Sequence, residues 1–229
     1  HCLPHYLRKR GYQTRWFTAS APDWDNKTYW LSHWYDDYDF DRTRQTDWSM
    51  FNHAGQWMRD NIDGEQPFFV GLFTKTNHWP FNPVHDMSEQ ERAGTPRNIG
   101  VSMRYSERSL AAFFDYIKDA PWYDRTIFII TADHGFNLGE QGFWRLRDPL
   151  IRPSTWLPLV FVGNHPELMA LPKATTHISS HVDFAPTVLD LLGIAEPNHF
   201  AGHSLLNPRF QESPYVYANH GTDMVFERD

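Results

Sequence analysis

The stretch "RTIFIITADHGFNLGEQG" (Arg125–Gly142) decides how this sequence is expected to fold. It opens with an apolar run of strand length and places Asp133 and His134 directly after that run. Three glycines follow within the next eight residues. A protein core needs neither charge nor so much backbone freedom, whereas a binding site needs polar ligands and close approach of the backbone. The stretch therefore predicts a buried strand that delivers two polar side chains at its carboxyl end.

Strand-like and helical periodicities alternate along the rest of the chain. Helices are expected at residues 3–11, 46–62, 102–120 and 183–194, and strands at 13–19, 67–74, 125–132 and 157–163. Asp183 is expected to cap the last helix, and residues 215–221 are expected to form an edge strand. This alternation indicates an α/β fold with a mostly parallel sheet covered by helices on both faces. One domain over residues 1–229 is expected.

The composition is that of a folded protein that does not bind nucleic acid. The chain has 229 residues, of which 41% are hydrophobic and 21% are charged, and its formal net charge is −7. A phosphate-binding surface would need an excess of basic residues, so nucleic acid is not an expected partner. The short basic cluster Leu7–Arg10 is interpreted as a solvated helix face. Cys2 is the single cysteine, which excludes an internal disulfide.

Aromatic residues make up 16% of the chain and gather between Arg15 and Asp41. Two interpretations are open for this cluster. The rings either pack an irregular segment, or they form a wall for a sugar or a lipid headgroup. Packing is the preferred interpretation, because Trp and Tyr fill irregular segments well.

Two of the expected strands end in residues that can do chemistry. One strand is followed by Asp133 and His134, and the strand at 67–74 is followed by Asn77 and His78. Ligands of parallel α/β sheets bind outside the carboxyl ends of the strands. An Asp oxygen with a His nitrogen suits Zn or Mn, and Mg or Ca stays open. In the alternative interpretation, Asp133 caps a turn and His134 is an ordinary packed polar residue.

Several segments together resemble the sulfatase family of the alkaline-phosphatase-like superfamily. "DRTIFIITADHGFNLGEQG" (Asp124–Gly142) resembles the family signature DNTxxxxTxDHGxxLGExG. Further segments resemble family motifs in the same order: "LPHYLRKRGYQT", "PFFVGLFTKTNHWPF", "STWLPLVFVGN", "SSHVDFAPTVLDLLGI" and "FAGHSLL". The resemblance covers the chain from Leu3 to Leu206 and implies a three-layer sandwich. Several motifs in one order are far more specific than any single one.

The resemblance also implies roles for particular residues. Asp133 and His134 match the C-terminal half of the family's divalent metal site, and the identity of the metal (Ca, Mg, Mn or Zn) stays open. His78 matches the histidine that contacts the transferred group, and Asn77 lies beside it as a substrate-binding residue. Many members carry a Lys after LGExG, where this chain offers two arginines that would contact the substrate anion, Arg145 and Arg147. His181 has two interpretations, and a structural role at the start of a helix is preferred to a place in the site.

The family's first strand, with the other acidic metal ligands and the nucleophile, has no match in this chain. We therefore expect the N-terminal part of the domain to be missing and the chain alone to be inactive. Cys2 is rejected as the nucleophile. The formylglycine motif C/S-x-P-x-R requires an arginine where Tyr6 stands. The nucleophile stays unknown.

The expected function is metal-dependent hydrolysis of sulfate or phosphate esters. One alternative is a membrane-anchored transferase of the lipoteichoic-acid-synthase type, which moves phosphoglycerol or phosphoethanolamine and would be anchored by segments outside this sequence. Another is a catalytically silent domain that binds a lipid or a glycan. The expected partner is a sulfated or phosphorylated small molecule, glycan or lipid headgroup, and the expected location is extracytoplasmic.

Overall fold

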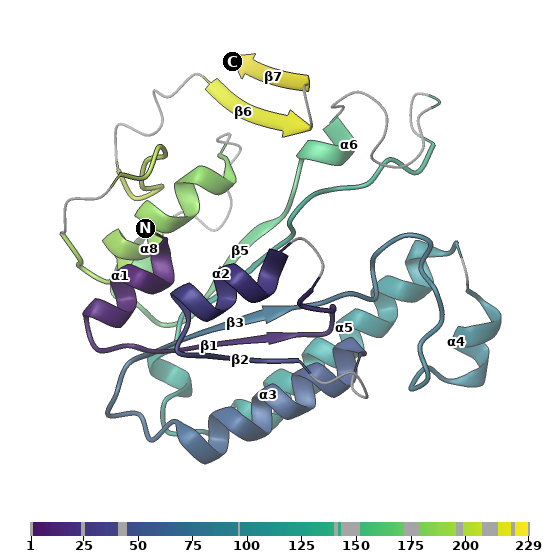
Figure 1. Cartoon of the computed structure of the whole chain (residues 1–229), viewed down its shortest axis with the longest axis horizontal. Helices are drawn as coiled ribbons and strands as arrows, with labels where there is room; N and C mark the ends of the chain where they lie inside the picture. The colour runs from purple at the N-terminus through teal and green to yellow at the C-terminus, as the bar shows by residue number, and fades with distance from the viewer. Residues whose placement is uncertain are drawn as a thin grey trace. The chain divides into compact units, whose positions relative to one another are not determined.

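A computed structural model of the chain describes residues 2–23, 26–40, 45–95, 97–139, 142, 152–171, 179–195, 199–207, 215–220 and 223–228. The chain divides into two compact units, His1–Tyr123 and Asp124–Asp229 (Figure 1). Each unit is described by itself below. Whether the two units form the single domain expected from the sequence stays a prediction.

The first unit contains a parallel sheet of three strands in the order β2-β1-β3. The strands are β1 (Gln13–Thr18), β2 (Asp37–Asp39) and β3 (Phe68–Phe73). In the register of the sheet, Trp16 of the central strand pairs with Tyr38 on one side and with Gly71 on the other. Helices connect these strands, as parallel pairing requires.

Helices cover both faces of this sheet. They are α1 (Leu3–Lys9), α2 (Lys27–Trp34), α3 (Asp47–Asn61) and α5 (Ile99–Ile117), with the short α4 (Glu89–Ala93) outside the layers. Figure 1 shows α1 and α2 over one face and the pair α3 and α5 over the other. The three-layer α/β architecture predicted from the sequence is therefore confirmed.

The helix pair α3 and α5 forms the most regular part of the core. Thr46 caps α3 in a capping box with Ser49, which satisfies backbone N–H groups that the first turn leaves open. Phe51 of α3 packs on Phe113 of α5 with ring centroids 5.4 Å apart. Both side chains are buried, so this contact joins the two helices through their apolar stripes.

Trp16 explains much of the aromatic cluster. Its ring contacts Trp30, Tyr35 and Phe73 at centroid distances of 5.7, 5.5 and 5.9 Å. A Cβ atom on Gly71 would lie 2.1 Å from the ring, so only glycine fits beside it in the register. The packing interpretation therefore holds for these rings, although they lie around a helix, α2, where an irregular segment was expected.

The second unit has its own pairs of strands. Its strands are β4 (Phe128–Thr131), β5 (Leu159–Val162), β6 (Tyr215–His220) and β7 (Asp223–Arg228), and its helical segments are α6 (Arg152–Thr155), α7 (Pro166–Ala170), η4 (His181–Asp183) and α8 (Phe184–Leu191). The turn η2 (Tyr123–Arg125) lies at the boundary of the units. β4 pairs with β5, and β6 with β7, in both cases antiparallel.

Two details differ from the sequence-based expectations. Strand β4, predicted to be buried, is half-buried and ends on an exposed residue, while β5 alternates between intermediate and exposed positions. Asp183 does not cap α8 through its side chain. Its carboxylate instead accepts a hydrogen bond from the backbone N–H of Ser180, because the helical segment begins one turn earlier, at η4.

Candidate active site

Asp133 and His134 lie two and three residues after the end of β4, with their side chains close to each other. The Nδ1 atom of His134 lies 2.9 Å from the carbonyl oxygen of Gly135. Because a carbonyl only accepts hydrogen bonds, the neutral ring carries its proton on Nδ1 and a lone pair on Nε2. Nε2 lies 3.7 Å from Oδ2 of Asp133. One carboxylate oxygen and one imidazole nitrogen thus lie close together at the end of the strand.

This pair fits two positions in the shell of a divalent metal ion. Metal–ligand distances to His nitrogen and carboxylate oxygen are about 2.0–2.2 Å, so a single ion can contact two atoms at the observed separation. A backbone carbonyl that fixes the other ring nitrogen is the usual support of a metal-binding histidine. Among the described residues, no group of three or more His, Cys, Asp or Glu side chains could complete such a site.

The loop after the pair is held by α6 through its backbone. The N–H of Gly135 donates to Ser154 at 2.9 Å, and the N–H of Phe136 donates to Pro153 at 3.1 Å. A Cβ atom on Gly135 would lie 2.0 Å from the carbonyl oxygen of Pro153. This glycine is therefore required by a close approach of two backbones, as the glycine-rich sequence suggested.

His181 contacts the strand end that carries the pair. Its Nε2 lies 2.8 Å from the carbonyl oxygen of Ala132, the residue before Asp133. The start of the helical segment is formed by other side chains, namely the capping box of Ser180 with Asp183. His181 is itself the first residue of this segment, η4, so the structure agrees with the preferred interpretation of a structural role at the start of a helix. No signal in the sequence pointed to the contact with Ala132, because the two residues are far apart in the chain.

In the first unit, Asn77 and His78 share the turn that follows β3. The N–H of His78 donates to Lys75 at 2.9 Å, and the N–H of Phe81 donates to His78 at 2.8 Å. The Nδ1 atom of His78 lies 2.6 Å from the carbonyl oxygen of Trp79. As in His134, the carbonyl holds a proton on Nδ1. Nε2 is then the ring atom that can accept a proton, or donate one when the ring is charged.

The structure thus places the predicted residues in two pairs. Asn77 and His78 lie in the first unit, Asp133 and His134 in the second, and all four side chains are exposed. Arg145 and Arg147, predicted to contact the substrate, lie outside the described residues. Sequence reasoning also missed Asp47, a buried acid that binds the backbone at the start of the turn of Asn77 and His78, called the His78 turn below. In the sequence, Asp47 looks like an ordinary acid in the first turn of a helix.

Comparison with solved structures shows which fold the chain has. The chain superimposes on a protein of the alkaline phosphatase superfamily from Vibrio parahaemolyticus with a TM-score of 0.78, at 22% identity, covering 99% of this chain and 55% of that one. The fold is therefore that of the alkaline phosphatase superfamily. Within it, the family model "Sulfatase" matches residues 1–194. The chain belongs to the sulfatase family.

Curated relatives include both sulfatases and transferases. An N-acetylglucosamine-6-O-sulfatase of Bacteroides thetaiotaomicron is 31% identical over 99 residues, 43% of this chain and 17% of that protein. Lipoteichoic acid synthase 1 of Bacillus subtilis is 28% identical over 138 residues, 57% of this chain and 21% of that protein. The match therefore spans only about a fifth of each relative. No helix in the described part of the chain is both long and apolar enough to cross a membrane.

Proposed function

We propose that this chain is part of a metal-dependent enzyme that hydrolyses sulfate or phosphate esters outside the cytoplasm. The observation that carries the proposal is the 3.7 Å separation between Oδ2 of Asp133 and Nε2 of His134, with the histidine held by Gly135. A bound divalent ion would offset negative charge on the tetrahedral group of the substrate. The metal could be Ca, Mg, Mn or Zn.

The residues of this chain supply the remaining parts of the proposed chemistry. Asp133 and His134 would hold the ion. The Nε2–H of a protonated His78 would donate to an oxygen of the transferred group or of the leaving group, since Nδ1 is engaged with Trp79. Asn77, beside it, would orient the substrate, and Arg145 and Arg147 would bind its anionic oxygens.

Similarity to lipoteichoic acid synthase 1 supports a second candidate, transfer of a phosphoglycerol group. The same metal ligands and the same histidine would serve both reactions, because each acts on a tetrahedral anion. The two candidates differ in the acceptor, which is water for a hydrolase and a lipid or glycan hydroxyl for a transferase. A silent binding domain is disfavoured, because such a domain has no need of a paired carboxylate and imidazole.

The test uses the full-length protein and its Asp133→Asn variant, with Asp60→Asn as the control. Asp60 is an exposed acid on α3. Titration calorimetry with Ca²⁺, Mg²⁺, Mn²⁺ and Zn²⁺ is expected to show at least 100-fold weaker binding in Asp133→Asn and no change in Asp60→Asn. Turnover of 4-nitrophenyl sulfate or phosphate is expected to fall in parallel. Unchanged metal affinity and turnover in Asp133→Asn would contradict the proposal.

A further inference from the structure

The first turn of α3 holds a carboxylate that is completely buried, Asp47. Oδ1 accepts hydrogen bonds from the backbone N–H groups of Lys75 at 2.7 Å and of Thr76 at 3.2 Å. Oδ2 accepts from the hydroxyl of Ser106 at 2.9 Å. A buried carboxylate costs free energy unless donors surround it, and here two donors come from the backbone directly before Asn77. Asp47 therefore anchors the backbone that leads from β3 into the His78 turn.

Helix α5 also binds the residues at the start of the His78 turn. The hydroxyl oxygen of Ser102, which is fully buried, lies 2.8 Å from the carbonyl oxygen of Thr76 and 2.6 Å from Oδ1 of Asn77. Ser102 and Ser106 are one turn apart, so they share one face of the helix. Ser102 thus contacts both the backbone and the side chain of the residues that precede His78.

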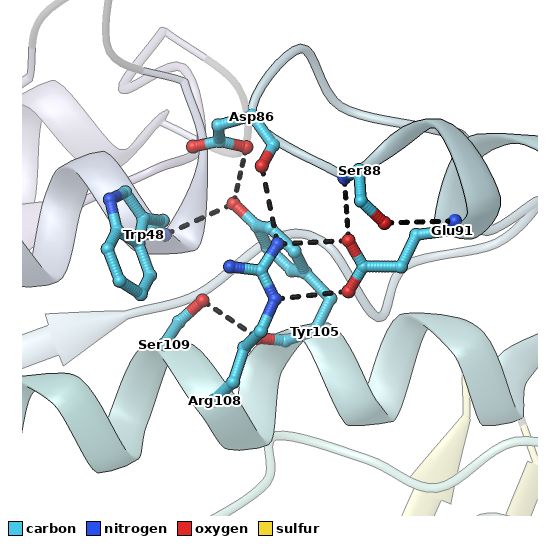
Figure 2. Close-up of polar contacts among 7 residues, drawn as sticks. All are labelled: Trp48, Asp86, Ser88, Glu91, Tyr105, Arg108 and Ser109. Carbon is cyan, nitrogen blue, oxygen red and sulfur yellow. Dashed lines mark hydrogen bonds and ion pairs between the residues drawn. The ribbon is translucent and has the colours of Figure 1, made fainter.

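A second turn, which follows later in the chain and contains Asp86, is held by the same two helices. Asp86 accepts hydrogen bonds from the hydroxyl groups of Thr46, at the N-cap of α3, and Tyr105, on α5. Its carbonyl oxygen accepts from Nη2 of Arg108 at 3.3 Å. Figure 2 shows Asp86 above α5 with Tyr105 and Arg108 turned toward it. Thr46, the N-cap of α3, therefore binds the turn of Asp86, and the adjacent Asp47 binds the residues before Asn77.

A bidentate ion pair extends this attachment to α4. Nε and Nη2 of Arg108 each donate to one oxygen of Glu91 at 3.0 Å (Figure 2). The same carboxylate accepts a hydrogen bond from the backbone N–H of Ser88, the N-cap of α4. Hydrogen bonds from Arg108 lower the pKa of Glu91 to about 2, so this carboxylate stays charged at neutral pH. The segment after His78 is thereby tied to α5 at two points.

We propose that Asp47 and Ser102 are positioning residues that hold Asn77 and His78 in the orientation that the reaction needs. The inference rests on the proposed function, since it requires His78 to act on the substrate. Neither residue has to touch the substrate: both act through the backbone and amide of the turn. An error of about 1 Å in the position of a catalytic group costs about 100-fold in rate.

The experiment compares buried serines of one helix in the full-length protein. Ser109 is buried on α5 like Ser102, but its hydroxyl donates to Tyr105 and does not touch the turn. Ser102→Ala is expected to lower kcat on 4-nitrophenyl esters about 10-fold or more, with KM and metal affinity unchanged. Ser109→Ala is expected to leave kcat within about twofold. Asp47→Asn, which keeps the shape of the side chain, should behave as Ser102→Ala does.

A double-mutant cycle separates positioning from general destabilisation. In a His78→Ala background, Ser102→Ala is expected to cause no further loss, because there is no histidine left to position. A second readout needs no turnover: the NMR signals of the His78 ring, assigned by their loss in His78→Ala, should shift or broaden in Ser102→Ala and not in Ser109→Ala.

The possible failures are distinguishable. If His78→Ala lowers kcat but Ser102→Ala and Ser109→Ala have equal effects, the positioning role is overturned and the proposed function stands. Equal losses from Ser102→Ala with and without His78 would also overturn it, as would unchanged His78 ring signals. If His78→Ala itself keeps full activity, the role proposed for His78 falls and the positioning role falls with it.

Discussion

At the scale of single residues, the same hydrogen-bond arrangement occurs in both predicted pairs of site residues. A backbone carbonyl one residue away binds Nδ1 of each histidine, Gly135 for His134 and Trp79 for His78. Each contact selects the ring tautomer and directs Nε2 away from the backbone. In each pair, a nearby carbonyl in the same turn leaves Nε2 available for the role proposed for that histidine.

Gly135→Ala is expected to damage the proposed metal site without removing either of the proposed ligands. The new Cβ would lie 2.0 Å from the carbonyl oxygen of Pro153, so the backbone beside His134 must shift. We expect at least 10-fold weaker binding of divalent metal by calorimetry and a loss of about 1–3 kcal/mol in the free energy of unfolding, as overpacking usually causes.

Gly100→Ala is the matched control for this glycine. In α5 the nearest atom to an added Cβ is Oδ1 of Asn98, at 3.4 Å. Helical alanine is favoured over glycine, so stability should be equal or slightly higher and metal affinity should not change. Equal metal affinity in Gly135→Ala and Gly100→Ala would show that the approach to Pro153 does not support the site.

At the scale of elements, the short helix α4 is attached to a longer helix by a polar contact. The five-residue α4 has no buried residue, and it is held to α5 by the ion pair of Glu91 with Arg108. The contact is bidentate, and the Glu91 side chain is 21% exposed. Such a segment depends on charge, so its stability should depend on pH.

Glu91→Gln is expected to remove a stabilisation that varies with pH. Hydrogen bonds from Arg108 lower the folded-state pKa of Glu91 from 4.5 to about 2. The contribution of Glu91 is therefore fully present above the unfolded-state pKa, near 4.5, and is lost as the pH falls toward 2. We expect a difference of about 1 kcal/mol in the free energy of unfolding at neutral pH, measured by urea denaturation, because the pair is partly exposed.

Glu89→Gln is the control for this pH dependence, because Glu89 is an exposed acid of the same helix. Its effect on the free energy of unfolding at neutral pH should be smaller than that of Glu91→Gln. A difference between the protein and Glu91→Gln that stays constant down to about pH 2 would contradict the pKa assigned to Glu91.

At the scale of the whole molecule, the sulfatase-family chain carries its two predicted pairs on separate compact units. His78 follows the edge strand of the described parallel sheet, and Asp133 with His134 follows β4 of an antiparallel pair. A ligand that binds only the folded protein stabilises all of it in proportion to the logarithm of its concentration. Metal binding should therefore be visible in the stability of the full-length protein.

We expect a divalent metal to raise the free energy of unfolding of the full-length protein by about 2.7 kcal/mol at 100 times its dissociation constant. Chelation should reverse the gain, and Asp133→Asn should abolish it. Thermal denaturation with and without the metal measures the effect. Equal stabilisation of the protein and of Asp133→Asn would place the binding elsewhere.

The sequence predicted most of the elements because periodicity is a property of each segment alone. The helix expected at 46–62 is α3 (Asp47–Asn61), and the strand expected at 67–74 is β3 (Phe68–Phe73). The first residue of a helix is harder to predict where more than one residue can serve as its N-cap. Asp183 was predicted as a cap, yet the segment begins at Ser180, because a capping box was available one turn earlier.

The sequence by itself determined the order of the main strands and helices, the polar residues that follow β3 and β4, and membership of the sulfatase family. Only the tertiary structure decided that Asp47 and Ser102 bind the His78 turn and that His181 binds Ala132. The physical reason is the separation along the chain over which each kind of interaction acts. Hydrophobic periodicity records which face of a segment is buried, whereas a hydrogen bond between distant residues depends on how whole elements pack.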